Sequence, residues 1–163
     1  MKAKGLSLLT LALLISGCAG EPNTNFINQS NILGAWDCSY TIIHDEGGET
    51  SKASIETKDD YLRNGRSNSF GIMKLKISPE FPEIEYSIAG TSSWEITGKY
   101  LVQQITDLKI VNLSHPELDS IIKIQDMFPQ GISESSEILK LTTHEMILRS
   151  ESTNDTYKCN KAF

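Results

Sequence analysis

The sequence predicts an all-β fold, most simply an antiparallel up-and-down β-barrel of about eight or nine short strands. Apolar and polar residues alternate with a period of two in several segments, as expected for strands with one buried face. Turn-forming residues separate these segments at regular spacing, and no internal repeat or second-domain boundary is present. The 163 residues, with 39% hydrophobic and 22% charged content, suit one globular domain. A β-sandwich is the alternative arrangement of the same strands.

The first half of the chain shows the alternation most clearly. Residues 36–42 alternate between apolar and polar side chains and predict a half-buried strand, and residues 44–48 predict a turn. A weaker strand is expected over residues 53–57, followed by a loop over residues 59–68 in which Asn64-Gly65 favours a turn. The remaining strands are expected at residues 73–77, 84–88, 94–96, 100–111, 138–141, 146–148 and 156–161.

One segment has helical instead of strand periodicity. Ser114 and Glu117 have the spacing of a capping box, and the proline between them suits a first helical turn. Apolar residues then recur at helical spacing as far as Phe128, which a proline follows. We therefore expect one amphipathic helix over residues 115–128. Its expected role is to cover an open end or face of the sheet, and binding of a partner is the alternative.

The N-terminal residues have the pattern of an export signal. Two lysines precede an apolar run over residues 6–15, which is too short for a bilayer span of roughly 20 residues. The run ends in Leu14-Ile15-Ser16-Gly17-Cys18, which resembles the bacterial lipobox. The resemblance implies that residues 1–17 are a cleaved signal peptide and that Cys18 is then acylated, with palmitate among the chains. An ordinary secreted protein with an unrelated cysteine is the alternative.

Cleavage would leave an acidic, lipid-anchored chain. Residues 18–31 are polar and are expected to form a lipidated tether, with residues 32–163 as the folded domain. Ala19, rather than Asp, follows the lipidated cysteine, which under the enterobacterial sorting rule implies delivery to the outer membrane. We expect the domain to lie on its periplasmic face. Loss of residues 1–17, which include two lysines and no acidic residue, changes the net charge from −6 to −8. Such acidity argues against nucleic-acid binding, which requires a basic surface.

The other two cysteines lie near the two ends of the folded domain. Export places Cys38 and Cys159 where disulfides persist, and only one pairing is open to them. In an up-and-down barrel the first and last strands are neighbours, so this disulfide favours the barrel over the sandwich. Two free buried thiols are the alternative.

Three stretches of the domain resemble lipocalins. Gly34-Ala35-Trp36 is similar to the G-x-W motif of lipocalins and other calycins, in which the Trp packs across the closed base of the barrel. Residues 94–101 (WEITGKYL) resemble a hairpin of bacterial lipocalin-like proteins, and residues 137–149 (EILKLTTHEMILR) resemble their closing hairpin. The resemblance covers most of the chain between Leu33 and Cys159 and implies a lipocalin-like barrel.

The interior of such a small barrel is either filled by side chains or hollow for one ligand, and the sequence leaves both open. In lipocalins a basic residue lies over the base Trp, and Arg149 and Lys161 are the two candidates for this role. The apolar-face residues that we expect to line a ligand site are Trp36, Tyr40, Met73, Tyr86 and Trp94.

No motif points to catalysis, a metal site or a cofactor. His44, His115 and His144 fall in separate turn or cap positions without metal-ligand spacing. Glu83 and Glu85 alternate with apolar residues, as expected for a solvent-facing strand surface and not for a catalytic carboxylate pair. No G-x-S-x-G elbow, P-loop or dinucleotide-binding glycine motif is present. We therefore expect a protein that is not an enzyme.

Two functions fit these expectations. The first is a membrane-anchored periplasmic lipocalin-like protein that binds a small apolar ligand or a lipid. The second is a protein-interaction module with a filled barrel core, such as a periplasmic inhibitor, an immunity protein or an envelope-assembly accessory lipoprotein. A mature charge of −8 would suit a basic protein partner in the second case.

Overall fold

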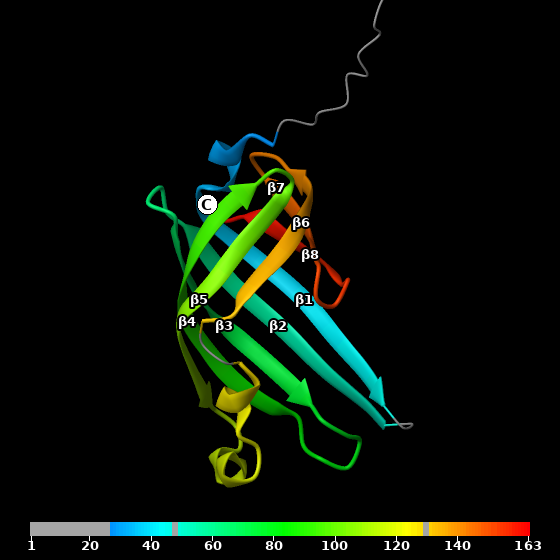
Figure 1. The fold of residues 1–163 in the computed structure, drawn as a ribbon. Helices are drawn as coiled ribbons and strands as arrows, with labels where there is room; N and C mark the ends of the chain where they lie inside the picture. Colours follow the sequence, from blue (N-terminus) through cyan, green and yellow to red (C-terminus); the bar gives the residue numbers. More distant parts are fainter. Residues whose placement is uncertain (1–26, 47–48, 129–130) are drawn as a thin grey trace, which may run out of the picture.

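The computed structural model describes residues 27–46, 49–128 and 131–163. These residues form a closed barrel of eight antiparallel strands in sequence order, with β8 returning to pair with β1 (Figure 1). The all-β antiparallel barrel is therefore confirmed. The predicted signal peptide (1–17), Cys18 and residues 18–26 of the predicted tether lie outside the described residues. The strands are β1 (Gly34–Glu46), β2 (Glu49–Tyr61), β3 (Arg66–Lys76), β4 (Ile84–Thr97), β5 (Tyr100–Asn112), β6 (Ser133–Leu141), β7 (Glu145–Ser150) and β8 (Thr156–Lys161).

The strands differ in length, and this difference gives the barrel two unlike ends. β1 to β5 have 11 to 14 residues each, whereas β6 to β8 have six to nine. β1 pairs with β8 only over residues 36–39, and β5 pairs with β6 only over residues 100–104. The ladder thus closes around one end, which we call the closed end. Beyond it β1 to β5 continue as a curved sheet towards the open end (Figure 1).

Trp36 forms the centre of the closed end. Its side chain is fully buried, and its indole Nε1 donates to the carbonyl oxygen of Ile32 at 2.6 Å. Ile32 ends the short 3-10 helix η1 (Gln29–Ile32), which covers this end of the barrel. Lys161 Nζ lies 4.3 Å from the centre of the Trp36 ring, within cation–π range. Of the two basic candidates Lys161 therefore lies over Trp36, while Arg149 pairs with Glu137.

The predicted disulfide ties the last strand to the first. Cys38 and Cys159 are directly opposite each other in the β1–β8 ladder, with their Cα atoms 4.0 Å apart, and they are bonded. Their separation of 121 residues is that of a long loop, for which the chain-entropy model gives a contribution of about 4–5 kcal/mol. Both cysteines belong to the packed core of the closed end.

The predicted amphipathic helix over residues 115–128 is wrong. This described stretch contains two short 3-10 helices, η2 (Pro116–Ser120) and η3 (Ile124–Met127), and no α-helix. The capping box does not form, because Ser114 Oγ accepts a hydrogen bond from the backbone N–H of Glu85 in β4 at 2.8 Å. Glu117 contacts the ring of His115 at 3.0 Å instead of the backbone of Ser114. Strand contacts therefore replace the local contacts that would have started a helix.

The segment nevertheless packs over the open end. Leu118, Ile122, Ile124 and Phe128 contact the core of this end, whereas Ile121, expected on the buried helical face, is 72% exposed. Gln125 Nε2 also donates to the carbonyl oxygen of Leu108 in β5 at 3.0 Å. Packing against the sheet thus sets the conformation of the segment. Within the described residues, no helix is long and apolar enough to cross a membrane.

The predicted loop over residues 59–68 is mostly strand. β2 continues to Tyr61 and β3 begins at Arg66, so the turn is confined to residues 62–65. Gly65 adopts a positive φ of 75° in this turn, which explains the strong turn signal at its position. Each of the residues 59–61 is paired with β1 on one side and β3 on the other. Because cross-strand pairing supplies their hydrogen bonds, these polar residues form strand despite their loop-like composition.

Candidate ligand-binding cavity

A cavity of about 530 Å³ occupies the barrel between its two packed ends. The closed-end core lies at one end, around Trp36. The open-end core lies at the other and contains Ile55, Met73, Ile84, Tyr86 and Ile124. Neither cluster of side chains fills the space that separates them.

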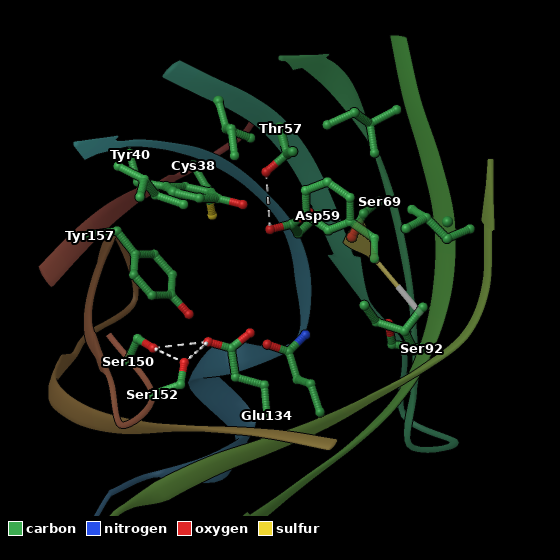
Figure 2. A pocket seen from close by; sticks show the side chains of 18 of the residues that line it. Cys38, Tyr40, Thr57, Asp59, Ser69, Ser92, Glu134, Ser150, Ser152 and Tyr157 are labelled. Carbon is green, nitrogen blue, oxygen red and sulfur yellow. Dashed lines mark hydrogen bonds between the residues drawn. The ribbon is translucent and has the colours of Figure 1, made fainter. Parts of the chain in front are cut away.

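Small side chains on β3 and β4 explain why this space is hollow. Ser69 faces Gly90 directly across the β3–β4 ladder, and both line the cavity together with Ser92 (Figure 2). A Cβ atom at Gly90 would lie 2.9 Å from the carbonyl oxygen of Asp107 on β5, so the bend of the sheet there requires glycine. Inward positions that carry so little volume leave the middle of the barrel unfilled.

One part of the cavity wall is apolar. Ile42, Ile55, Ile88 and Ile110 come from four different strands, and Phe128 is contributed by the segment that covers the open end. These side chains belong to the open-end core or pack against it. This part of the wall therefore suits a hydrocarbon body rather than a hydrated group.

The remaining wall is polar, and Asp59 is its most enclosed charged group. Asp59 lies directly opposite Trp36 in the β1–β2 ladder. Its carboxylate accepts a hydrogen bond from Thr57 Oγ1 at 3.3 Å and a second from Ser69. Burial raises the pKa of Asp59 above its ordinary value of 3.8, and the two hydrogen bonds oppose this shift. No Lys, Arg or His among the described residues forms an ion pair with it.

Glu134 supplies a second carboxylate from β6. Its Oε1 atom accepts hydrogen bonds from the hydroxyls of Ser150 at 2.9 Å and Ser152 at 3.4 Å (Figure 2). The two hydroxyls are also within 2.9 Å of each other. This small network fixes the carboxylate without a basic residue, because none of the described residues forms an ion pair with it.

Three tyrosines complete the polar wall. The Tyr40 and Tyr157 rings are in contact, with centroids 5.5 Å apart, and Tyr61 packs edge-on against Trp94 at 5.7 Å. Burial, reinforced by the nearby carboxylates, raises the pKa of all three hydroxyls, that of Tyr157 to about 12. All three are therefore neutral at physiological pH. The Tyr157 hydroxyl lies 3.2 Å from Ser136 Oγ.

The five residues predicted to line a ligand site separate into two groups. Tyr40 is in the wall of the cavity. Trp36 and Trp94 belong to or pack against the closed-end core, and Met73 and Tyr86 belong to the open-end core. These four therefore lie in the packed ends above and below the cavity, and ligand contact by all five stays a prediction.

Sequence reasoning missed Asp59, Tyr61, Glu134 and Tyr157. The first two lay in a stretch interpreted as a loop, although a signal was present. The period-two alternation of Ile55 and Thr57 continues through Asp59 to Tyr61, and all four line the cavity. Glu134 had no such signal, because it precedes the apolar residues that predicted β6.

The predicted histidine and glutamate positions do not converge. His115 contacts Glu117 and the His144 ring lies 6.1 Å from that of Phe163, while the side chain of His44 is outside the described atoms. Glu85 faces Lys74 across the β3–β4 ladder at 4.0 Å. In the described part of the chain, no three His, Cys, Asp or Glu residues are grouped as a metal site would require.

Comparison with known proteins adds no assignment. Neither a protein-family model nor a curated protein sequence matches this chain. The lipocalin resemblance of the three sequence stretches therefore stays a prediction.

Proposed function

We propose that this protein is a lipid-anchored, lipocalin-like binding protein of the periplasm, which holds a small, largely apolar ligand inside its barrel. The observation that carries the proposal is the cavity of about 530 Å³. Ligand pockets are commonly about 300–1,000 Å³ and combine apolar walls with a few polar groups. The isoleucine wall and the tyrosine and carboxylate wall have this composition.

The hollow middle of the barrel favours this function over the protein-interaction module. The alternative was tied to a filled core, in which inward side chains would occupy the lumen. In this barrel the inward-facing residues Ser69, Gly90 and Ser92 are too small to fill the lumen, which stays open. Hollowing a core costs packing energy, so retention of the space is easiest to explain by a bound molecule.

Membrane anchoring is proposed from the sequence. Cys18 would carry the acyl chains, and stable anchoring requires at least two hydrophobic signals, which a lipobox cysteine acquires. The Cys38–Cys159 disulfide fits an oxidising compartment such as the periplasm. In the producing bacterium, Cys18→Ser should abolish incorporation of labelled palmitate and release the protein from the membrane fraction. Retention of the label in the variant would contradict this assignment.

Native mass spectrometry of the full lipidated protein tests ligand binding directly. We expect protein purified from its host to carry an additional small-molecule mass that is lost on unfolding. Ser92→Phe places a large side chain in the lumen and should remove this mass. Ser93→Phe, on the exposed outer face one residue later, is the matched control and should retain it. If wild-type protein carries no additional mass, or if Ser92→Phe carries the same additional mass as wild-type protein, the proposal is overturned.

A further inference from the structure

The charged residues that line the cavity all have the same sign. Asp59, Asp107, Glu134 and Asp155 contribute carboxylates, and no Lys, Arg or His is among the described lining residues. Lys161 does not offset this charge. It lies over Trp36 at the closed end and donates to the carbonyl oxygen of Leu33, away from the lumen. The cavity is therefore a negatively charged space inside an acidic protein.

Among these four carboxylates, ionisation is least favourable for Asp59, because burial removes most of its hydration. An ionised carboxylate that loses its hydration requires either an opposite charge or a full set of hydrogen bonds. Asp59 receives hydrogen bonds from Thr57 and Ser69 and has no cationic partner among the described residues. A cation in the adjoining cavity would supply the missing opposite charge.

Glu134 faces the same space from the other side of the barrel. Figure 2 shows Asp59 and Glu134 across the cavity from each other, with the Tyr40 and Tyr157 side chains along one side of it. Both carboxylates lie close enough to act electrostatically on both tyrosine hydroxyls. Because Glu134 is held by Ser150 and Ser152, its position is fixed before any ligand arrives.

The tyrosine rings are the second, independent feature that suits a cation. Aromatic faces attract ammonium groups through the ring quadrupole, and the attraction grows when water is excluded. Tyr40 and Tyr157 form a contacting pair at the cavity wall. The rings of Tyr40 and Tyr157 and the carboxylates of Asp59 and Glu134 therefore all line the same cavity.

We propose that the ligand is an organic cation, an amine or quaternary ammonium with an apolar body. This inference rests on the proposed function and specifies the class of ligand. The cationic group lies between Asp59 and Glu134, against the rings of Tyr40 and Tyr157. The apolar body lies along the isoleucine wall towards Phe128.

Three probes with the same hydrocarbon body and different head groups test the inference. Hexyltrimethylammonium, hexanol and hexanoate are titrated by calorimetry into the full-length protein held in nanodiscs, with empty nanodiscs as blanks. We expect the cation to bind at least tenfold more tightly than the alcohol and hexanoate to bind most weakly. If all three bind with equal affinity, or if hexanoate binds best, the inference is overturned while the proposed function stands.

Charge-neutralising variants test which carboxylates attract the cationic group. Asp59→Asn preserves the shape of the side chain and should weaken binding of hexyltrimethylammonium about tenfold, with little change for hexanol. Glu134→Gln should have a smaller effect in the same direction, because Glu134 is more exposed. Asp37→Asn removes the same charge from the exposed outer face of β1 and is the matched control. Equal loss of affinity in Asp37→Asn and Asp59→Asn would mean that net charge alone attracts the cation, and would overturn the site.

A failure of the proposed function gives a different result. In that case none of the three probes binds, and Ser92→Phe has the same titration curves as wild-type protein. Binding of the cation that survives in Ser92→Phe would place it outside the lumen and would overturn the inference.

Discussion

The two ends of the barrel are built in different ways. The closed end is surrounded by all eight described strands, covered by η1 and tied by the Cys38–Cys159 disulfide. At the open end β1 and β5 extend beyond their neighbours β8 and β6, and a non-strand segment with two 3-10 turns covers the sheet. The most extensively paired part of the barrel is therefore separated along its axis from the part with the fewest strand contacts. Local opening is expected where cooperative contacts are fewest.

Loss of the disulfide should have the largest effect, because it frees the closed end. In the double variant Cys38→Ser, Cys159→Ser we expect the free energy of unfolding to fall by about 4 kcal/mol, since a loop of over 100 residues is no longer closed in the unfolded chain. Chemical denaturation of wild-type and variant proteins measures the change. A loss below about 1 kcal/mol would mean that strand pairing alone closes the barrel.

Truncation of one leucine at each end compares the two cores directly. Leu148 is fully buried at the closed end, whereas Leu118 lies in η2 and is only partly buried. Leu148→Ala should cost about 3–4 kcal/mol, and Leu118→Ala about 1 kcal/mol, because the covering segment adjusts around the smaller side chain. Thermal unfolding measures both variants. Equal losses would show that the open end is as firmly packed as the closed end.

Asp59 lies between the two ends, and its removal should stabilise the protein. Because burial raises the pKa of Asp59 in the folded state, ionised Asp59 opposes folding above that pKa. Asp59→Asn should therefore increase the free energy of unfolding at neutral pH by about 1 kcal/mol or less. The gain should disappear as the pH falls through the folded-state pKa and below 3.8, where wild-type Asp59 is protonated in both states. Unfolding curves of wild-type protein and Asp59→Asn at several pH values measure this difference in stability.

A destabilised Asp59→Asn variant would contradict this interpretation of Asp59. It would indicate that the ionised carboxylate is stabilised by its hydrogen bonds from Thr57 and Ser69 more than burial disfavours it. We expect Asp59→Asn to gain stability and to lose cation binding. This combination is typical of a residue that is retained for binding at a cost in stability.

The surface ion pairs of the closed end should have the smallest effect. Glu145 on β7 contacts Lys140 and, at 2.7 Å, Lys158, and these hydrogen bonds lower its pKa from 4.5 to about 2. A depressed folded-state pKa stabilises the protein above pH 4.5, and the contribution is lost as the pH falls towards 2. Glu145→Gln should thus lower Tm slightly at neutral pH, and the difference should disappear once the pH falls below about 2. A difference that persists in acid would assign another role to Glu145.

The structure also explains which sequence signals were reliable. The alternation over residues 36–42 predicted β1 because these residues face a packed core on one side and solvent on the other. The same rule failed over residues 59–68, where the inward residue Asp59 is polar and lines the cavity. A hydrophobic pattern finds strands that face a core, and misses those that face a polar site.

The region that covers the open end shows the limit of local signals. Its capping box and apolar spacing favour an α-helix, yet Ser114 bonds to β4 and Gln125 to β5. These contacts join residues that are far apart in the sequence, so a local pattern does not contain them. The intrinsic preference for helix is a fraction of a kcal/mol per residue, which a few tertiary contacts exceed.

Side-chain patterning and chain order were sufficient to predict the all-β class, the antiparallel order of the strands and the cysteine pair that closes the barrel. These follow from side-chain periodicity and from neighbouring strands, both of which are properties of chain order. The folded barrel was needed to see that the lumen is hollow and that Asp59, Glu134 and the tyrosines line it. A cavity depends on the volumes of side chains that meet from different strands, and a carboxylate acquires its environment only when those strands close around it.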